Sequence, residues 1–501
     1  MQPLTLEEII RAIGGRPLAE PTPRSISRVG IDSRAVQPGE LFFALRGERF
    51  DGHEFVPAAL ASGAAAAVVS DPEVETGHPG LADRLILVPD TLAALGALGA
   101  YYRGQIPAVV IGVTGSNGKT TTKFMIDQVL GSRRQGRAAV KSFNNSVGVP
   151  ITLLSAERGD EYLVVEIGTN APGEVAALSR LARPDIAVVV SIGEEHLEFL
   201  DNIEQIAEEE TSVLAHVPPG GLAVVCFEAL EQAASKGDAR LNRVTFGRDA
   251  AADLRASRIE MTAEGLRFLL NERFEYRLPM IGPHNAINAL AAIAVGRRFG
   301  MEHDAIAAAL AAFRPPPMRM NVETRGAITV INDAYNANPT SMEAGLAALD
   351  AWSGRGRRVA LLGEMHELGK HSERCHAALG RAAARSSAQL VVAIGRHAET
   401  VTRAVTTAAP DKPTACFEKV ADAEKGLAAL LQPKDVILLK GSRAAGIERL
   451  LPMIESIGPV RSASRVARRA SPPGRESKGT RRSGSRGRTP RRTASRRGGS
   501  A

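Results

Sequence analysis

The sequence has no long run of apolar residues and only three cysteines. No segment reaches the roughly 18 uninterrupted apolar residues that a membrane-spanning helix needs. The N-terminus, from Met1 to Glu8, lacks the basic start and the apolar run of a secretory signal. Cys226, Cys375 and Cys416 are scattered and odd in number, which argues against a disulfide framework and a zinc knuckle. We therefore expect a cytoplasmic location and free, buried thiols.

Acidic residues are almost absent from residues 461–501, where 14 Lys or Arg stand against one acid, Glu476. Because this segment carries +13 and the whole chain +7, residues 1–460 carry −6. The segment is rich in Ser, Gly, Pro and Arg and lacks aromatic residues, so we expect a disordered basic tail. It is either a solvated, dispensable extension or a surface that contacts nucleic acid or anionic groups through charge, a contact that salt would weaken.

The length of 501 residues is too great for one compact core and suits about three domains of roughly 100–200 residues each. The first, residues 1–107, is predicted to be a small mixed α/β domain. It opens on a predicted helix over residues 5–15, in which Thr5 and Glu8 form a capping box and two glycines follow the last turn. Residues 39–45 are predicted to form a strand.

Short apolar runs alternate with helical segments from residue 108 onward. In the predicted central domain, residues 108–318, the runs are Val109–Val113, Leu163–Val165, Ile186–Val190 and Leu222–Val225. In the predicted C-terminal domain, residues 319–460, they are Ile328–Ile331, Val359–Leu362, Leu390–Ile394 and Val436–Leu439. Such runs are typical of parallel sheets that helices cover on both faces, so the predicted fold class is α/β. Ligands bind beyond the carboxyl ends of such strands, so the polar residues after each run are the candidate site residues.

The segment Gly112–Thr120 reads G-V-T-G-S-N-G-K-T and lies between a predicted strand and a predicted helix. Glycines let the backbone approach phosphate oxygens, and the helix N-terminus presents free N–H groups to an anion. Val113 stands where the strict phosphate-loop pattern has glycine. We expect Lys119 to contact the outer phosphates of ATP and Thr120 to help to hold Mg²⁺. The other predicted ATP contacts in the loop are Thr114, Gly115, Ser116, Asn117 and Gly118.

Further polar residues follow later strands or begin a helix. Glu166 follows Leu163–Val165, and His196 follows the next apolar run, so both are candidates for a Mg²⁺ site. The alternative for each is a loop residue with its own hydrogen bonds satisfied. Asn285 and Asn288 lie three apart at a predicted helix start, where they either face one ligand or cap the helix.

The predicted C-terminal domain adds two more polar clusters. Arg319 lies at the predicted hinge, from which an arginine can swing onto a transferring phosphate or form a surface salt bridge. Residues 333–339 follow the strand Ile328–Ile331, and residues 440–443 follow Val436–Leu439. A parallel sheet places both clusters at the same edge, where a site is expected.

Together these motifs resemble the Mur ligases of peptidoglycan synthesis over about residues 26–450. The resemblance rests on T-G-S-N-G-K-T at 114–120, E-I-G-T-N at 166–170, G-P-H-N-A-I-N at 282–288 and the hinge arginine. Within the family, four further motifs resemble the ligase type that adds D-alanyl-D-alanine last. They are G-E-R-F-D-G-H at 47–53, N-N-S-V-G-V-P at 144–150, D-A-Y-N-A-N-P-T-S at 333–341 and G-E-M-H-E-L-G at 363–369.

The resemblance implies three domains, of which the first binds the uridine nucleotide, the second binds ATP and Mg²⁺, and the third, Rossmann-like, binds the incoming dipeptide. The implied catalytic residues are Lys119, Arg319, His196 and Glu210, and the implied metal ligands are Thr120, Glu166, His196 and Glu210. Asn285 is implied to contact adenine, Asp333 the ribose, and Arg319 the γ-phosphate. The implied substrate-binding residues are Ser33, Arg34, Arg46, Asn144, Asn145, Tyr335, Asn336 and Asn338. Family members are mostly monomers.

One position departs from the family pattern. After the metal-binding histidine the family usually has a lysine that CO₂ carbamylates, and this position falls on Glu210, within three successive glutamates. Our hypothesis is that Glu210 supplies the carboxylate directly, without CO₂. The alternative is an acidic, solvated helix face with a weakened metal site.

The implied reaction joins D-alanyl-D-alanine to UDP-N-acetylmuramoyl-tripeptide. ATP phosphorylates the tripeptide carboxylate, the dipeptide amine attacks the acyl phosphate, and phosphate leaves. Two alternatives stay open from the sequence: another ligase of the superfamily, such as an earlier Mur ligase or a folylpolyglutamate synthase, and a nucleotide-dependent switch or nucleic-acid-binding protein that uses the basic tail. The sequence identifies neither the general base nor the third residue of the tripeptide, diaminopimelate or lysine.

Overall fold

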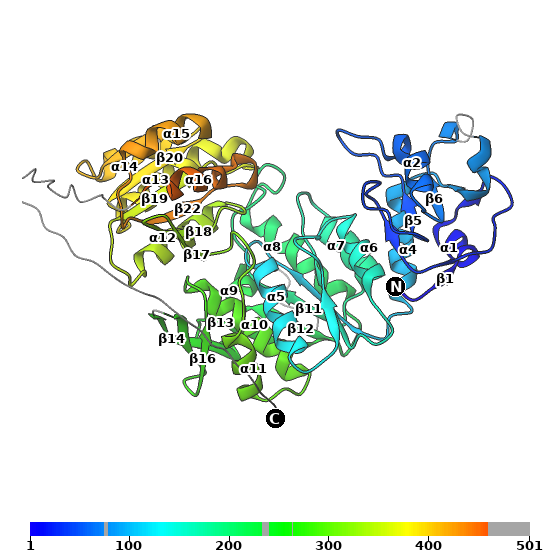
Figure 1. The fold of residues 1–501 in the computed structure, drawn as a ribbon. Coiled ribbons are helices and arrows are strands. Elements are labelled where there is room, and N and C mark those ends of the chain that lie inside the picture. The colour runs from blue at the N-terminus through cyan, green and yellow to red at the C-terminus, as the bar shows by residue number, and fades with distance from the viewer. Residues whose placement is uncertain (75–78, 233–239, 263, 459–501) are drawn as a thin grey trace, which may run out of the picture. The chain divides into compact units, whose positions relative to one another are not determined.

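A computed structural model describes residues 1–74, 79–232, 240–262 and 264–458 (Figure 1). The described residues form a mixed α/β fold with three larger sheets and one two-stranded sheet, β1(Leu4–Thr5) with β3(Ser25–Ile26). The predicted α/β class is confirmed at this level. The predicted basic tail lies outside the described residues. Among the described helices, none is long and apolar enough to span a membrane.

The N-terminal residues form a five-stranded sheet in the order β2-β7-β6-β5-β4. Its strands are β2(Arg16–Pro17), β4(Val29–Gly30), β5(Leu41–Phe43), β6(Ala66–Val69) and β7(Leu85–Leu87), parallel except for the β2 pair. Its helices are α1(Leu6–Ile13), α2(Val56–Ala61) and α4(Thr91–Arg103). The predicted capping box of Thr5 and Glu8 is present, and Gly14 ends α1 in the left-handed region. The predicted strand at 39–45 is the shorter β5.

The central residues form a nine-stranded sheet in the order β16-β15-β14-β13-β12-β11-β8-β10-β9. Six strands run parallel: β8(Val109–Thr114), β9(Gly136–Ala138), β10(Tyr162–Glu166), β11(Ile186–Val189), β12(Leu222–Cys226) and β13(Asn242–Gly247). The four apolar runs predicted as strands are confirmed within them. The strand β14(Leu254–Thr262) also pairs parallel with β13, and β15(Gly265–Leu270) and β16(Phe274–Leu278) then continue the sheet in antiparallel pairs; none of the three was predicted from the sequence.

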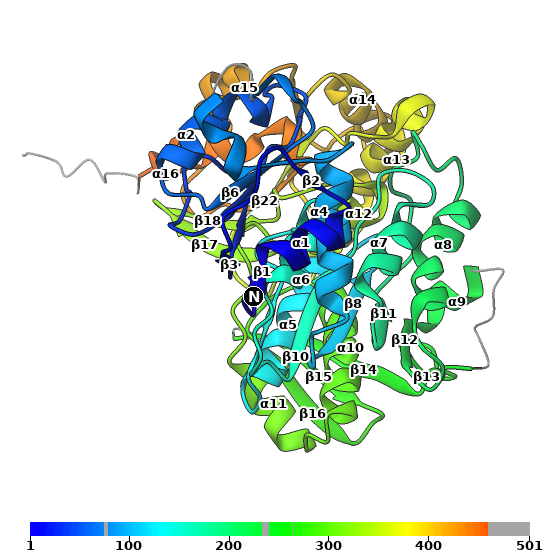
Figure 2. The ribbon, with the colours of Figure 1, turned by 90° about the vertical axis from the view of Figure 1, so that its right-hand side faces the viewer.

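Helices cover both faces of the parallel part of this sheet, which explains its uninterrupted apolar strands. On one face, α5(Lys119–Gly131) lies beside α10(His284–Arg298) in both ribbon views (Figure 1 and Figure 2). On the other, α4 packs with α6(Gly148–Ser155) and α7(Glu174–Ala182). Along β8 the side chains alternate between the two faces. Ile111 is buried in the core under α5 and α10, and Val110 is buried in the core under α4, α6 and α7. The remaining helices of this region are α8(Ile203–Thr211), α9(Phe227–Gln232) and α11(His303–Ala311).

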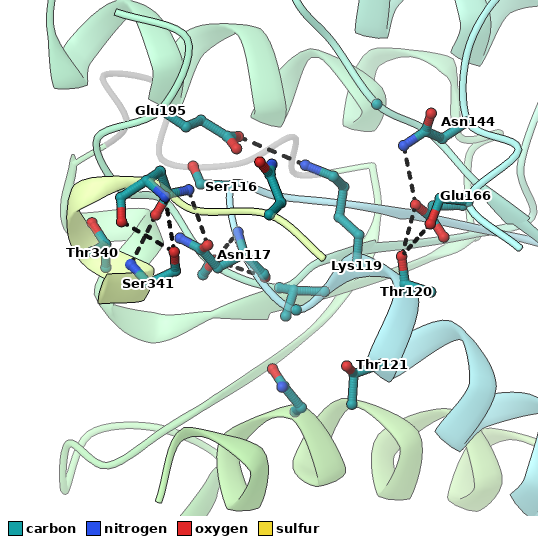
Figure 3. Close-up of a pocket in the computed structure, with 18 of the residues that line it drawn as sticks. Ser116, Asn117, Lys119, Thr120, Thr121, Asn144, Glu166, Glu195, Thr340 and Ser341 are labelled. Atoms are coloured by element: carbon teal, nitrogen blue, oxygen red, sulfur yellow. Dashed lines mark hydrogen bonds and ion pairs between the residues drawn. The ribbon is translucent and has the colours of Figure 1, made fainter. Parts of the chain in front are cut away.

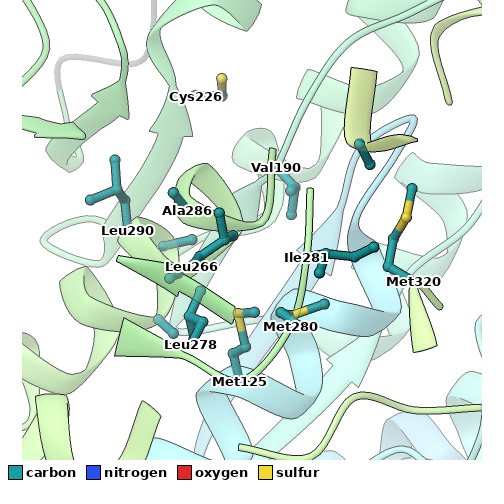
Figure 4. Packing of buried hydrophobic residues seen from close by; sticks show 14 of the residues in the cluster. Met125, Val190, Cys226, Leu266, Leu278, Met280, Ile281, Ala286, Leu290 and Met320 are labelled. Carbon is teal, nitrogen blue, oxygen red and sulfur yellow. The ribbon is translucent and has the colours of Figure 1, made fainter. Parts of the chain in front are cut away.

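Figure 4 shows the core under α5 and α10. Met125 of α5, Leu290 of α10 and Leu278 of β16 meet in it, and all three are buried. Burial of large apolar side chains contributes about 1.5–3 kcal/mol each. The helix that begins at Lys119 therefore stands on a rigid base, and the loop before it is held at a fixed position.

The C-terminal residues form a six-stranded sheet in the order β17-β18-β22-β19-β20-β21. Its strands are β17(Asn321–Arg325), β18(Ile328–Asn332), β19(Arg358–Gly363), β20(Leu390–Ile394), β21(Thr414–Phe417) and β22(Val436–Lys440). Only the β17–β18 pair is antiparallel, and the four predicted strands are confirmed. The helices are α12(Pro339–Asp350), α13(Ser372–Arg385), α14(Ala398–Ala408), α15(Val420–Gly426) and α16(Leu451–Glu455).

The three cysteines are free, as predicted. Cys226 and Cys375 are buried, but Cys416 is exposed, so the prediction of burial is wrong for that residue. Cys416 lies on β21, the edge strand of the C-terminal sheet, where one side of the strand has no neighbour to cover it.

Candidate active site

The predicted phosphate loop connects β8 to α5. Gly115 and Gly118 have φ values of +126° and +84°, a region that side chains rarely adopt, so glycine is needed at both turns. The loop is tied to the end of β11, because the Ser116 N–H donates to the Ser191 carbonyl (2.9 Å) and the Asn117 N–H donates to Ser191 Oγ (2.8 Å). Lys119, the first residue of α5, donates from Nζ to the Gly115 carbonyl (2.5 Å). The backbone thus has the shape predicted for a phosphate-binding loop.

A cavity of about 720 Å³ opens over this loop. Most of the predicted site residues line it, from both the central and the C-terminal sheets (Figure 3). They are Ser116, Asn117, Gly118, Lys119, Thr120, Asn144, Asn145, Glu166, His196, Asn285, Arg319, Asp333, Tyr335, Asn336 and Asn338. Six predicted site residues do not line it: Thr114, Gly115, Glu210, Ser33, Arg34 and Arg46.

Glu166, at the end of β10, is buried beside Thr120 at the start of α5. Its Oε1 accepts hydrogen bonds from Thr120 Oγ1 and Asn144 Nδ2, both at 3.1 Å. Its Oε2 lies 3.1 Å from Nζ of Lys123, a fully buried lysine one helical turn after Lys119. Burial lowers the pKa of Lys123, and the charge of Glu166 opposes that shift. Lys123 was not predicted from the sequence, because a lysine on a helix is ordinarily solvated.

His196 lies in the loop after β11 and adopts a left-handed backbone conformation, with φ of 48°. Its Nδ1 is 2.6 Å from Glu367 Oε2, and its Nε2 is 3.6 Å from Glu195 Oε2. Burial favours neutral imidazole, but Glu367 and Glu195 outweigh it and raise the pKa of His196. Neither carboxylate was singled out from the sequence, although Glu195 adjoins His196 and Glu367 lies in the quoted G-E-M-H-E-L-G motif.

Three carboxylates act on the charge of Lys119, two of them at short distance. Glu195 Oε1 is 3.7 Å and Glu210 Oε1 is 4.0 Å from Lys119 Nζ. Burial alone would lower the pKa of Lys119, but Glu195, Glu210 and Glu166 together raise it, so the lysine stays charged. Burial raises the pKa of Glu195 to about 7, with Lys119 and His196 opposing the shift.

Glu210 is fully buried on α8 and directs its carboxylate at the loop from behind. Its Oε2 accepts from the Gly115 N–H (2.7 Å) and from the Thr114 hydroxyl. The alternative of a solvated acidic face therefore does not describe Glu210, although Glu208 on the same helix is exposed.

The hinge residue Arg319 reaches the start of α5. Its Nη2 is 3.2 Å from Thr120 Oγ1, and its guanidinium carbon is 4.0 Å from the centre of the Tyr335 ring. A cation over an aromatic face at this distance is attracted to the ring. The surface salt bridge that was the alternative for Arg319 is not found among the ion pairs of the described residues.

The segment after β18 is fixed by buried polar contacts. Lys440 Nζ, at the end of β22, is 2.5 Å from Asp333 Oδ2 and donates to the Asn336 carbonyl at 3.0 Å. Asn338 caps α12 and donates from Nδ2 to Asn117 Oδ1 of the phosphate loop at 3.0 Å. The two polar clusters predicted for the C-terminal sheet therefore meet, as expected for adjacent parallel strands.

The amide side chain of Asn285 is engaged within α10. Its Nδ2 donates to the Ile281 carbonyl (2.7 Å), and its Oδ1 accepts from Asn288 Nδ2 (2.9 Å). The helix cap is Pro283, so neither asparagine is the N-cap. Burial lowers the pKa of the neighbouring His284 to about 4, so that this imidazole is neutral at ordinary pH.

Arg34 and Arg46 belong to the N-terminal sheet region and are exposed. Arg34 pairs with Asp32 at 2.8 Å, and this pairing holds the pKa of Asp32 at about 2. Arg46 pairs with Asp51 at 2.9 Å and with Asp71 at 3.5 Å. Arg34 and Arg46 are thus held by ion pairs apart from the cavity lining, and their role at a uridine nucleotide stays a prediction.

The oxygen atoms that line the cavity suit Mg²⁺ only when a bound nucleotide supplies further oxygen ligands. Among the described side chains, no group of three or more His, Cys, Asp or Glu is placed to hold a metal ion. However, Glu195 Oε1 is buried without a hydrogen bond, and the Thr120 hydroxyl adjoins the Glu166 carboxylate. Mg²⁺ ordinarily takes one or two carboxylates together with substrate phosphates and water, which these oxygens suit.

Comparison with known proteins decides the family. The description "Mur ligase family, catalytic domain" matches residues 25–103, "Mur ligase middle domain" matches residues 113–296, and "Mur ligase, glutamate ligase domain" matches residues 318–443. The chain belongs to the Mur ligase family. The predicted family is thereby confirmed, and with it an ATP-dependent ligase.

Two curated Mur ligases show the degree of similarity. The chain is 34% identical to the UDP-N-acetylmuramoyl-tripeptide--D-alanyl-D-alanine ligase of Bacillus subtilis, over 90% of this chain and 98% of that protein. It is 34% identical to the Escherichia coli protein of the same name, over 87% of this chain and 95% of that protein.

Solved structures of Mur ligases agree with the fold. MurF from Acinetobacter baumannii has a TM-score of 0.81 at 32% identity and covers 91% of this chain and 99% of its own. MurF from Thermotoga maritima, solved with ADP, has a TM-score of 0.75 at 29% identity over 85% of this chain and 97% of its own. A folylpolyglutamate synthase from Mycobacterium tuberculosis is 21% identical with a TM-score of 0.58, so the likeness to that alternative is one of fold alone.

Proposed function

We propose that this Mur ligase joins D-alanyl-D-alanine to UDP-N-acetylmuramoyl-tripeptide, with ATP converted to ADP and phosphate. The observation that carries the proposal is the meeting of two segments in one cavity. The phosphate loop at the end of β8 faces the D-A-Y-N-A-N-P segment after β18, and Asn117 and Asn338 are hydrogen bonded between them. Two curated relatives, each 34% identical to this chain, carry the name of this reaction.

The reaction needs ATP because a carboxylate has no useful leaving group at neutral pH. Transfer of the γ-phosphoryl group to the tripeptide carboxylate forms an acyl phosphate and releases ADP. The dipeptide amine then attacks the acyl carbon, loses a proton, and expels inorganic phosphate as the amide forms. The cavity provides groups for both steps, because its lining includes the cationic side chains of Lys119 and Arg319 and amide side chains such as that of Asn336.

Two cations of this chain are placed to neutralise the transferring phosphoryl group. Lys119 is held charged by three carboxylates and lies at the helix N-terminus, where phosphate oxygens bind. Arg319 enters from the hinge and reaches Thr120 of the same turn. Charge that develops on phosphoryl oxygens is stabilised by such preorganised donors.

Thr120 and Glu166 would hold Mg²⁺ together with the nucleotide phosphates, with Glu195 and His196 beside them. When bound, the metal ion supplies further charge neutralisation at the phosphate oxygens. The His196 ring lies between two carboxylates, with Nδ1 2.6 Å from Glu367 Oε2 and Nε2 3.6 Å from Glu195 Oε2.

The remaining residues are proposed to orient the substrates. Asp333 and Asn285 would take the ribose and the adenine, and both line the cavity. Tyr335, Asn336 and Asn338, with Asn144 and Asn145, would contact the tripeptide end and the dipeptide. Ser33, Arg34 and Arg46 would bind the uridine nucleotide within residues 1–107. We place the reaction in the cytoplasm, where its nucleotide substrates are made available.

The test is phosphate release with each substrate omitted in turn, combined with mass analysis of the product. We expect release only when ATP, the tripeptide nucleotide and D-alanyl-D-alanine are all present, and a product heavier by one dipeptide. Lys119→Met should abolish it. Activity with free L-lysine, diaminopimelate or L-glutamate in place of the dipeptide would reject the proposal in favour of another ligase. Phosphate release that nucleic acid stimulates without the peptide substrates would reject ligation altogether.

A further inference from the structure

A buried carboxylate holds the phosphate loop from the side opposite the cavity. Glu210 has no exposed surface and is not part of the cavity lining. Its Oε2 accepts two hydrogen bonds from the point where β8 becomes the loop, one from the Gly115 N–H at 2.7 Å and one from the Thr114 hydroxyl. Its Oε1 has no hydrogen-bond partner among the described residues and lies 4.0 Å from Lys119 Nζ.

These contacts fix the two parts of the loop that bear on phosphate. Gly115 has a φ of +126°, one of the many backbone conformations that glycine can adopt, so fixing it costs conformational entropy. Its N–H donates to Glu210, and its carbonyl accepts from Lys119 Nζ at 2.5 Å. Glu210 therefore holds the peptide group before Gly115 directly and attracts Lys119 through charge, and Lys119 in turn holds the peptide group after Gly115. A hydrogen bond to a charged group in a buried site is roughly twice as strong as a neutral one.

We infer that Glu210 is a positioning residue for the phosphate loop, which sets Gly115 and Lys119 to receive the nucleotide phosphates before any metal ion is bound. The inference rests on the proposed ATP site and deepens it. Glu210 does not line the cavity and its Oε2 binds the loop directly, so its contribution to nucleotide binding does not depend on a metal ion. A carboxylate that acted only as a metal ligand would contribute nothing to nucleotide binding in the absence of that ion.

The neighbouring Glu209 provides a matched control. It is also buried on α8, and its two carboxylate oxygens accept from the N–H groups of Gly173 (2.6 Å) and Val175 (2.8 Å) at the start of α7. Glu209→Gln therefore removes an equally buried charge from the same helix without a contact to the phosphate loop. Thr114→Val provides a second, independent change, because it removes one of the two donors that bind Glu210.

The experiment is the affinity of the full chain for ADP, measured by calorimetry once with Mg²⁺ and once with EDTA. For Glu210→Gln we expect the Kd for ADP to rise about 10- to 100-fold in EDTA, because a charged hydrogen bond and an ion pair are lost. We expect the Kd to rise by a similar factor with Mg²⁺. Thr114→Val should raise the Kd less, and the double variant should match Glu210→Gln alone, because both changes act on one contact. Glu209→Gln should leave the Kd unchanged.

Amide hydrogen exchange of the ligand-free chain gives a second measurement that needs no nucleotide. Amide exchange over residues 114–119 should be faster in Glu210→Gln and Thr114→Val than in the unchanged chain. In Glu209→Gln it should be the same as in the unchanged chain. An affinity loss confined to Mg²⁺ conditions, unchanged loop exchange, or equal losses in the Glu209 variant would each overturn the inference. Normal ADP binding without any ligated product would instead count against the proposed function alone.

Discussion

Replacing Lys123 with methionine should destabilise the central sheet strongly, even though the lysine lies outside the nucleotide cavity. Lys123 is fully buried, with Nζ 3.1 Å from Glu166 Oε2 and a hydrogen bond to the Lys141 carbonyl. Methionine fills a similar volume and so leaves the apolar packing in place. It also leaves Glu166, 1% exposed, without its countercharge.

The magnitude follows from the burial of both partners. At 3.1 Å the attraction is about 5 kcal/mol for an effective dielectric constant of about 20. Removal of one partner from a buried ion pair typically costs about 3–5 kcal/mol, because the other charge is left uncompensated. Local opening of β10 and the first turn of α5 should therefore become roughly 100- to 4,000-fold more frequent, at tenfold for each 1.4 kcal/mol.

Hydrogen exchange over residues 119–126 and 162–166 measures this change, with denaturant unfolding of the whole chain beside it. Addition of Mg²⁺ and ADP should stabilise Lys123→Met more than the unchanged chain, if Glu166 is a metal ligand, since a cation then replaces the missing countercharge. The double variant with Glu166→Gln has neither charge, so it should be more stable than Lys123→Met and gain nothing extra from Mg²⁺. Equal exchange in Lys123→Met and the unchanged chain would refute the reasoning.

Three further predictions concern the cavity itself. Arg319→Lys should lower kcat by about 100-fold, because the lysine point charge lacks the planar guanidinium that contacts phosphate. Tyr335→Leu should lower kcat only about 2- to 5-fold, because it removes only the cation–π contact. Equal kcat values for the two variants in steady-state assays would contradict this order. His284 has a pKa lowered to about 4 by burial, against an ordinary value of 6.5. Between pH 4 and 6.5 the unfolded chain therefore binds a proton that the folded chain does not. The contribution of His284 to the free energy of unfolding is complete above pH 6.5 and is lost as the pH falls from 6.5 to 4. The free energy of unfolding of His284→Gln, taken from denaturation curves at several pH values, should depend less on pH across that window. Finally, ligase activity should be the same in CO₂-free and bicarbonate-supplemented buffer if, as we hypothesise, Glu210 supplies its carboxylate without CO₂, and stimulation by bicarbonate would count against this hypothesis.

The sequence predicted the strands and the residues at their ends, because both follow from local rules. Runs such as Val109–Val113 are apolar on consecutive positions, and the structure buries the two faces of β8 in two separate cores. The phosphate loop was equally predictable, since its glycines fit the turn between a strand and a helix, and Gly115 and Gly118 have the positive φ that glycine adopts readily. The antiparallel β14–β16 was missed because its strands alternate between buried and exposed positions and lack uninterrupted apolar runs.

Charge pairing between elements was what the sequence did not reveal. Lys123 and Glu166 are 43 positions apart, and nothing local distinguishes a buried lysine from a solvated one on the same helix. Glu367 follows a strand of the C-terminal sheet, whereas His196 follows a strand of the central sheet. The sequence of neither segment indicates that the two side chains lie close together. In the same way, Asn285 was expected to be either a ligand contact or a cap, and the structure engages it with Asn288 and Ile281 instead of at the cap.

The pairing that the sequence does not reveal is also what allows the site to exist before its ligand arrives. Around the phosphate loop, the carboxyl groups of Glu166, Glu195 and Glu210 are opposed by the ammonium groups of Lys119 and Lys123. Burial raises the pKa of Glu195 to about 7, so a proton on this carboxyl group lessens the negative charge of the cluster. Buried charge is costly unless it is paired, so a cluster balanced in this way keeps the loop ordered in the empty enzyme. A nucleotide then meets donors that are already oriented and does not have to order them, which is the condition for stabilising charge as it develops on a phosphoryl group.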